Sequence, residues 1–142
     1  MPLDAIEVLR TVPLFQQVPE VDLQALAQLV RERSHTKGAV ILSQGDSGDA
    51  LFLIRTGQVK VTVIAENGRE VILSVLGGGS FFGEMALLDG GPRTASVIAE
   101  GPVVCLTIGR TRFLKLLREE STIAIAIVEE LARRLRAVQI SE

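Results

Sequence analysis

A run of short segments rich in β-branched residues, separated by turn sequences, constrains this chain more than any other feature. Six such segments occupy residues 40–42, 51–54, 59–64, 71–76, 94–99 and 103–108. Turn sequences containing glycine separate them, and Asn67-Gly68 is a strong hairpin signal because both residues tolerate a positive φ. Short strands at this regular spacing predict an antiparallel sandwich or barrel, and we expect the sheet region to span residues 34–109.

Apolar residues at helical spacing lie on both sides of this strand region. Before it, they predict two helices within residues 4–32, the second over about residues 19–31. After it, Thr111 and Ser121 are candidate caps for two further helices within residues 111–140. Four apolar side chains of the last helix are predicted to form one stripe: Ile127, Leu131, Leu135 and Val138. This stripe either packs on the barrel or pairs with a second copy of the chain.

Length and charge narrow the class of protein. The 142 residues suit one compact α+β domain, with N-terminal helices, a barrel of about eight strands and a long C-terminal helix. The formal charge of −2, with both signs mixed along the chain, lacks the basic footprint of nucleic-acid binding, so we expect no such contact. No stretch approaches the ~20 apolar residues of a membrane span, and no basic signal-peptide start is present, so a cytoplasmic protein is expected.

Residues that bind metals or perform covalent chemistry are scarce. Cys105 and His35 are the sole cysteine and histidine, which leaves no internal disulfide and no usual set of zinc ligands. Cys105 alternates with Val103 and is predicted to be a buried core thiol, whereas His35 is predicted to be a solvated strand residue. Since the sequence offers no nucleophile–base pair and no metal constellation, we expect a non-catalytic protein.

One segment, residues 81–96, departs from plain strand patterning. Its sequence is Phe-Phe-Gly-Glu-Met-Ala-Leu-Leu-Asp-Gly-Gly-Pro-Arg-Thr-Ala-Ser, and it predicts a short helical turn over residues 84–88. A helix start presents free backbone N–H groups to an anion, and the guanidinium of Arg93 can take two oxygens of one phosphate. Glu84 would repel a bare phosphate, so its carboxylate suits a hydroxyl donor such as a sugar 2′-OH. A phosphate and a ribose hydroxyl on adjacent atoms describe a cyclic nucleotide.

The same segment resembles a known family motif. Phe-Gly-Glu-Met-Ala-Leu followed by Pro-Arg-Thr-Ala-Ser is similar to the phosphate-binding cassette of cyclic-nucleotide-binding domains. The upstream stretches Gln44-Gly45-Asp46, Leu51-Phe52-Leu53-Ile54 and Gly57-Gln58-Val59 are similar to the family's other signature. The resemblance covers nearly the whole chain and implies a β-roll, or jelly roll, flanked by helices.

The resemblance also implies a role for individual residues. Arg93 would bind the exocyclic oxygens of the cyclic phosphate, and Glu84 would accept a hydrogen bond from the ribose 2′-OH. Around them, the candidate ligand-binding positions near the phosphate and ribose are Phe82, Gly83, Met85, Ala86 and Thr94. The candidates beneath the purine are Val61, Leu73 and Leu76.

The last helix would close over the base as a lid. In regulators of the catabolite-activator type, a lid arginine lies in an Ala-Arg-Arg-Leu stretch, which residues 132–135 match and which makes Arg134 the candidate here. The pair of hydroxyl-bearing residues that contacts adenine in those regulators is replaced by Val138 and Gln139, so this chain departs from that mode of base reading.

We therefore expect a sensor that binds a cyclic nucleotide, with cAMP favoured and cGMP as the alternative. We expect no cofactor besides this ligand, and the C-terminal helix would serve as lid and as a dimer helix. The Arg93-Thr94 pair bears on the nucleotide, because a threonine after the cassette arginine is associated in the family with cGMP acceptance. Two other readings stay open: the sensor part of a catabolite-activator-type transcriptional regulator, and a ligand-free dimerisation barrel.

Overall fold

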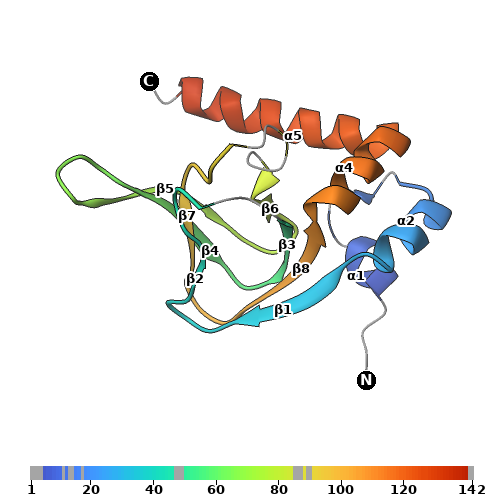
Figure 1. The fold of residues 1–142 in the computed structure, drawn as a ribbon, viewed down its shortest axis with the longest axis horizontal. Helices are drawn as coiled ribbons and strands as arrows, with labels where there is room; N and C mark the ends of the chain where they lie inside the picture. Colours follow the sequence, from blue (N-terminus) through green and yellow to red (C-terminus); the bar gives the residue numbers. More distant parts are fainter. Residues whose placement is uncertain are drawn as a thin grey trace.

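A computed structural model describes residues 5–10, 12, 15–16, 18–46, 50–84, 88 and 91–140 (Figure 1). The helices are α1 (Ala5–Arg10), α2 (Glu20–Ala27), α4 (Arg110–Glu119) and α5 (Ser121–Ile140). The strands are β1 (Arg31–His35), β2 (Val40–Leu42), β3 (Ala50–Thr56), β4 (Val59–Ile64), β5 (Glu70–Leu76), β6 (Phe81–Phe82), β7 (Ser96–Ala99) and β8 (Val103–Gly109). The predicted α+β order of helices, eight strands and helices is confirmed.

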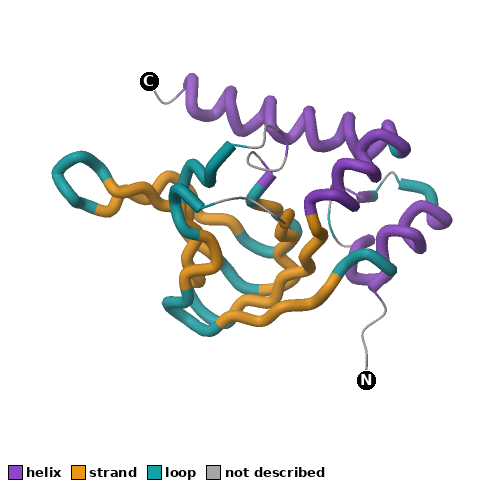
Figure 2. Tube along the Cα trace, in the orientation of Figure 1, coloured by secondary structure: helices purple, strands orange, loops and turns teal. Residues whose placement is uncertain are grey.

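The strands form two antiparallel sheets that make a roll. One sheet has the order β1-β8-β3-β6 and the other β2-β7-β4-β5, so each sheet joins strands that are distant in sequence. Figure 2 shows α1, α2 and α4 gathered on one side of the roll, with α5 running across its top in this view. The β4–β5 hairpin, with its predicted turn at Asn67-Gly68, projects from the other side (Figure 1).

Two apolar clusters hold these layers together, because successive side chains of a strand point to opposite faces. On one face of β3, Leu51 and Leu53 pack with the helices, including Phe113 of α4 and Ile123 of α5. The other face contributes Ile54 and its neighbours to the interior of the roll. Phe52 there stacks on Phe82, with 4.9 Å between ring centroids, and Cys105 is fully buried as predicted.

The boundary between the second helix and the sheets lies earlier than predicted. Helix α2 ends at Ala27, and residues 31–35 form β1 rather than the end of a helix. The strand was missed because its sequence, Arg-Glu-Arg-Ser-His, has no apolar alternation, and pairing with β8 rather than hydrophobic burial defines it. His35 lies in a strand as predicted, but its side chain is partly buried and its Nε2 is fully buried, so the imidazole is less solvated than predicted.

The C-terminal helices have the predicted extents but different starts and faces. Gly109, not Thr111, occupies the N-cap of α4, and the carbonyl of Glu120 accepts the first bond of α5, which places Ser121 inside that helix. The predicted stripe on α5 does not share one environment. Ile127 is buried against the roll, whereas Leu135 is exposed. In the part of the chain described, no helix is both long and apolar enough to cross a membrane.

Candidate functional site

A cavity of about 450 Å³ lies between the β2-β7-β4-β5 sheet, the segment after β6 and the end of α5. All nine of the predicted ligand-binding residues that the structure describes line it: Phe82, Gly83, Glu84, Arg93, Thr94, Val61, Leu73, Leu76 and Arg134. Met85 and Ala86, predicted to offer backbone N–H groups, lie outside the described residues. Sequence motifs far apart in the chain thus meet around one space of the size of a ligand pocket.

Arg93 is built into the wall of this cavity. Its side chain is only 5% exposed, and its Nη1 and Nη2 donate to the carbonyl oxygens of Gly83 at 2.7 Å and Ala50 at 3.1 Å. Its backbone is also fixed, since its N–H donates to the Asp46 carbonyl and its own carbonyl accepts from Gly45. The strand predicted over residues 94–99 begins only at residue 96, as β7, so Arg93 precedes it by three residues. The guanidinium is therefore positioned by a loop tied to the turn at residues 45–46.

Gly83 is required for this arrangement. Its φ is +90°, a region that residues with a Cβ rarely adopt. A Cβ at this position would lie 2.7 Å from Nη1 of Arg93 and 3.1 Å from the carbonyl oxygen of Ala50. The absence of a side chain thus allows the backbone of the Phe-Gly-Glu motif to approach the arginine.

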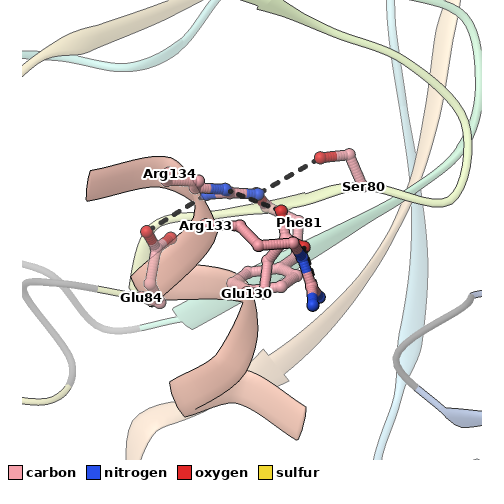
Figure 3. A network of polar contacts seen from close by, with 6 residues as sticks. All are labelled: Ser80, Phe81, Glu84, Glu130, Arg133 and Arg134. Atoms are coloured by element: carbon pink, nitrogen blue, oxygen red, sulfur yellow. Dashed lines mark hydrogen bonds and ion pairs between the residues drawn. The ribbon is translucent and has the colours of Figure 1, made fainter. Parts of the chain in front are cut away.

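Glu84 is buried, with 6% of its surface exposed, and its carboxylate meets the last helix. Its Oε1 lies 3.3 Å from Nη1 of Arg134. Arg134 also donates to the Phe81 carbonyl at 2.7 Å and to the Ser80 hydroxyl at 3.2 Å, and its guanidinium stands 4.4 Å above the Phe81 ring (Figure 3). Glu130 accepts from Nε of Arg134 one turn earlier on α5.

We call Arg134 and its four partners, Ser80, Phe81, Glu84 and Glu130, the Arg134 network. It joins the C-terminal half of α5 to β6 and to Glu84, which lines the cavity, and Figure 3 shows its side chains. The described lining residues carry two guanidiniums, from Arg93 and Arg134, and one carboxylate, from Glu84, which gives a formal charge of +1. This charge suits a ligand with a single negative group.

The rest of the cavity is mainly apolar. Val61 of β4 and Leu73 and Leu76 of β5 form a wall that can accept a flat ring. Sequence reasoning missed five further lining residues: Leu42, Ser74, Ala95, Val97 and Ala137. Alternation along the strands could have indicated Val97, because it faces the same side as Ala95 and pairs with Val61. No sequence signal placed Ala137, since its position depends on how α5 packs.

Metal and thiol chemistry find little support in the described residues. Within them, no group of three or more His, Cys, Asp and Glu side chains could hold a metal ion. Burial raises the pKa of the Cys105 thiol to about 11, so it stays protonated and unreactive near neutral pH.

Comparisons with known proteins agree with this geometry. The family model described as cyclic nucleotide-binding domain matches residues 32–120. The chain is 36% identical over 124 residues to the cyclic AMP receptor protein of Thermus thermophilus, covering 87% of this chain and 57% of that protein. It is 39% identical over 120 residues to the cGMP-dependent protein kinase egl-4 of Caenorhabditis briggsae, covering 83% of this chain and 16% of the kinase.

A solved structure shows the same arrangement in space. The crystal structure of the Thermus thermophilus catabolite activator protein superposes with a TM-score of 0.83 at 35% identity, covering 91% of this chain and 61% of that one. The chain therefore spans little more than half of the regulator and under a fifth of the kinase. The part in common with the solved structure is the helix-flanked roll.

Proposed function

The chain belongs to the cyclic nucleotide-binding domain family, and we propose that it acts as a regulatory sensor whose ligand is cAMP. The observation that carries the proposal is the pairing of buried Arg93 with buried Glu84 in the lining of one cavity. Arg93 is held by two neutral carbonyl oxygens and Glu84 by Arg134, and the guanidinium suits an added anion while the carboxylate suits an added hydroxyl donor. A cyclic nucleotide offers both, as a phosphate anion and a hydroxyl donor.

Each part of the ligand has a counterpart in the cavity. Arg93 is held in place by two carbonyl oxygens, so its guanidinium meets the cyclic phosphate with little loss of side-chain entropy. Glu84 accepts from the ribose 2′-OH, and a carboxylate has enough lone pairs to accept from Arg134 as well. The purine lies on the apolar wall formed by Val61, Leu73 and Leu76.

The nucleotide changes the conformation by acting on α5. Arg134 meets Glu84 at 3.3 Å, so a ribose that binds Glu84 adds contacts beside the Arg134 network. The bound state gains these contacts and the free state lacks them, and this difference is what allows a ligand to shift an equilibrium. The module transmits occupancy through the position of its last helix and performs no chemistry on the nucleotide.

Calorimetric titration with cAMP and with cGMP tests the proposal. Loss of a charge-assisted phosphate contact costs roughly 1.5–3 kcal/mol, so Arg93→Ala is expected to weaken cAMP binding by about tenfold to a hundredfold. Arg118→Ala is the matched control, because that exposed arginine of α4 does not line the cavity. Equal affinities of wild type and Arg93→Ala, with both folded, would refute the assignment.

The choice between the two nucleotides rests on two observations. Thr94 lines the cavity next to Arg93 and supplies a hydroxyl that a guanine amino group can reach. The similarity to the cyclic AMP receptor protein, over 87% of this chain, favours cAMP. We therefore expect tighter binding of cAMP than of cGMP, with Thr94→Ala reducing cGMP binding more than cAMP binding in the same titrations.

A second proposal concerns assembly into a dimer, as in a transcriptional regulator. Apolar residues that α5 leaves exposed follow one another at spacings of three, four and three residues: Ile125, Val128, Ala132 and Leu135. This spacing is that of the paired positions of a coiled coil. We expect sedimentation equilibrium to show a dimer for wild type and a monomer for Val128→Glu. A monomeric wild type would reject the dimer and leave nucleotide binding untouched.

A further inference from the structure

A second cavity, of about 490 Å³, lies on the other side of the wall that closes the first. Phe52 lines the second cavity and stacks on Phe82, which lines the first. Ala50 also lines the second cavity, while its carbonyl oxygen accepts from Arg93 of the first. The two spaces are therefore distinct and are separated by one layer of side chains and backbone.

Basic groups converge on this second cavity. Arg31, Arg33 and His35 alternate along β1 and so face the same side of the strand, and Arg112 joins them from α4. None of the described lining residues is acidic, and none of the ion pairs found among the described residues uses these three arginines. Like charges gathered without a counter-charge repel one another, and a bound anion would remove that repulsion.

The imidazole of His35 provides a second, independent indication that this cavity holds a ligand. Its Nε2 is buried and makes no hydrogen bond with any residue that the structure describes. A buried polar atom without a partner costs free energy that a bound group or water would recover. Because His35 lines the cavity, an anion placed there can take a hydrogen bond from Nε2.

The start of α4 adds to the positive character of the cavity. Gly109, which lines the cavity, is the N-cap of this ten-residue helix and provides no side-chain cap. The first turn contains no acidic residue, although helix N-termini favour negative charge, and Arg112 stands there instead. The backbone N–H groups of this turn are thus another set of donors for an anion.

The cavity also has apolar lining residues, which we call its apolar floor: Leu29, Ile41, Ala50 and Phe52. We propose that this cavity binds a small organic anion, with its charged group between Arg31, Arg33, His35 and Arg112 and its apolar part on Phe52 and Ile41. The site is distinct from the proposed nucleotide cavity and does not depend on it.

Phenyl phosphate is a suitable probe because it combines a phosphate with a flat apolar ring, and inorganic phosphate tests the charged group alone. Titrations at constant ionic strength, followed by backbone amide NMR shifts, are expected to show phenyl phosphate binding with shifts in β1 and the first turn of α4. Arg33→Ala and Arg112→Ala should each weaken it by at least about fivefold, a loss typical of a charge-assisted contact at a partly open site. Arg118→Ala, an exposed arginine of α4 outside the cavity, should leave it unchanged.

The Arg93→Ala variant separates this proposal from the proposed function. It should lose cAMP affinity yet bind phenyl phosphate as wild type does. Binding of phenyl phosphate that disappears in Arg93→Ala, or that survives both Arg33→Ala and Arg112→Ala, would overturn the second site. Equal affinity for phenyl phosphate and inorganic phosphate would overturn the role of the apolar floor, and no binding of either would overturn the proposal as a whole. Thermal unfolding of each variant checks that it is folded.

Discussion

The two halves of α5 are held to the roll by different forces. In the first half, Ile123 and Ile127 are buried in the cluster that joins the helices to β3 and β8. In the second half, only the first residue, Leu131, still packs against this cluster among the described side chains. Residues 132, 133 and 135–137 are exposed, and Arg134 reaches the roll through the Arg134 network. Apolar burial is non-directional and persists whatever occupies the cavity, whereas polar contacts can exchange partners with a ligand. We infer that the first half anchors the helix and the second half responds.

The largest expected effect comes from weakening the anchored half. Ile127 is 2% exposed, and Ile127→Ala is expected to lower the free energy of unfolding by about 2–5 kcal/mol, the range for removing a buried aliphatic side chain. Val21→Ala, a 69% exposed residue of α2 that lies outside the proposed dimer stripe, is the matched control and should change the free energy of unfolding by less than about 0.5 kcal/mol. Urea unfolding of the two variants and of wild type measures these changes in the free energy of unfolding. Similar losses for the two variants would contradict an anchor made of buried residues.

A smaller effect is expected when the responsive half is released. Arg134→Ala removes the contact with Glu84. A hydrogen bond contributes a net free energy of about 0.5–1.5 kcal/mol, so we expect this variant to lose about two- to tenfold in cAMP affinity. Arg133→Ala, which removes only the exposed pair with Glu130, should leave affinity unchanged. Calorimetry on both variants makes the comparison. A larger loss for Arg133→Ala than for Arg134→Ala would place the responsive contact elsewhere on the helix.

The smallest effect concerns the junction before the anchored half. The pKa of the Glu120 carboxyl lies above its ordinary value. Burial of the carboxyl is the first cause, and a hydrogen bond with Asp22 and repulsion from the Asp22 carboxylate add to it. A raised folded-state pKa gives stability that is complete below the unfolded-state pKa and is lost as pH rises through the folded-state value. The glutamine of Glu120→Gln stays neutral at every pH, whereas the wild-type carboxyl ionises as pH rises. The Tm of the variant should therefore exceed that of wild type by a margin that grows from about pH 4 to pH 7.

The matched control for that series is Glu129→Gln, which removes an exposed carboxylate from α5 itself. Its Tm relative to wild type should stay nearly constant over the same pH range. If the two variants followed the same pH dependence, the effect would be one of net charge and not of the contact between Glu120 and Asp22.

Sequence reasoning succeeded where local chemistry dictates structure. Alternation and turn residues indicate β4 and the Asn67-Gly68 hairpin, and the Phe-Gly-Glu and Pro-Arg motifs bring Glu84 and Arg93 to one cavity. These features depend on short stretches whose residues carry their own constraint, such as the positive φ of Gly83.

Sequence reasoning failed where the structure depends on contacts between segments that are far apart in the chain. β1 has no apolar pattern and exists through pairing with β8, about seventy residues later, as the pair Arg31 and Thr107 shows. The buried face of α5 depends on where α4 directs it, so Ile127 and Leu135 were grouped although one is buried and the other exposed. The basic cavity was missed for the same reason, because β1 and α4 supply its charges from separate parts of the chain.

Hydrogen exchange along α5, measured by mass spectrometry with and without saturating cAMP, tests the central claim most directly. We predict unchanged exchange over residues 121–128 and slower exchange over residues 129–137 when cAMP is present. A change of equal size along the whole helix, or no change in the second half while calorimetry shows binding, would contradict a helix anchored at one end and responsive at the other.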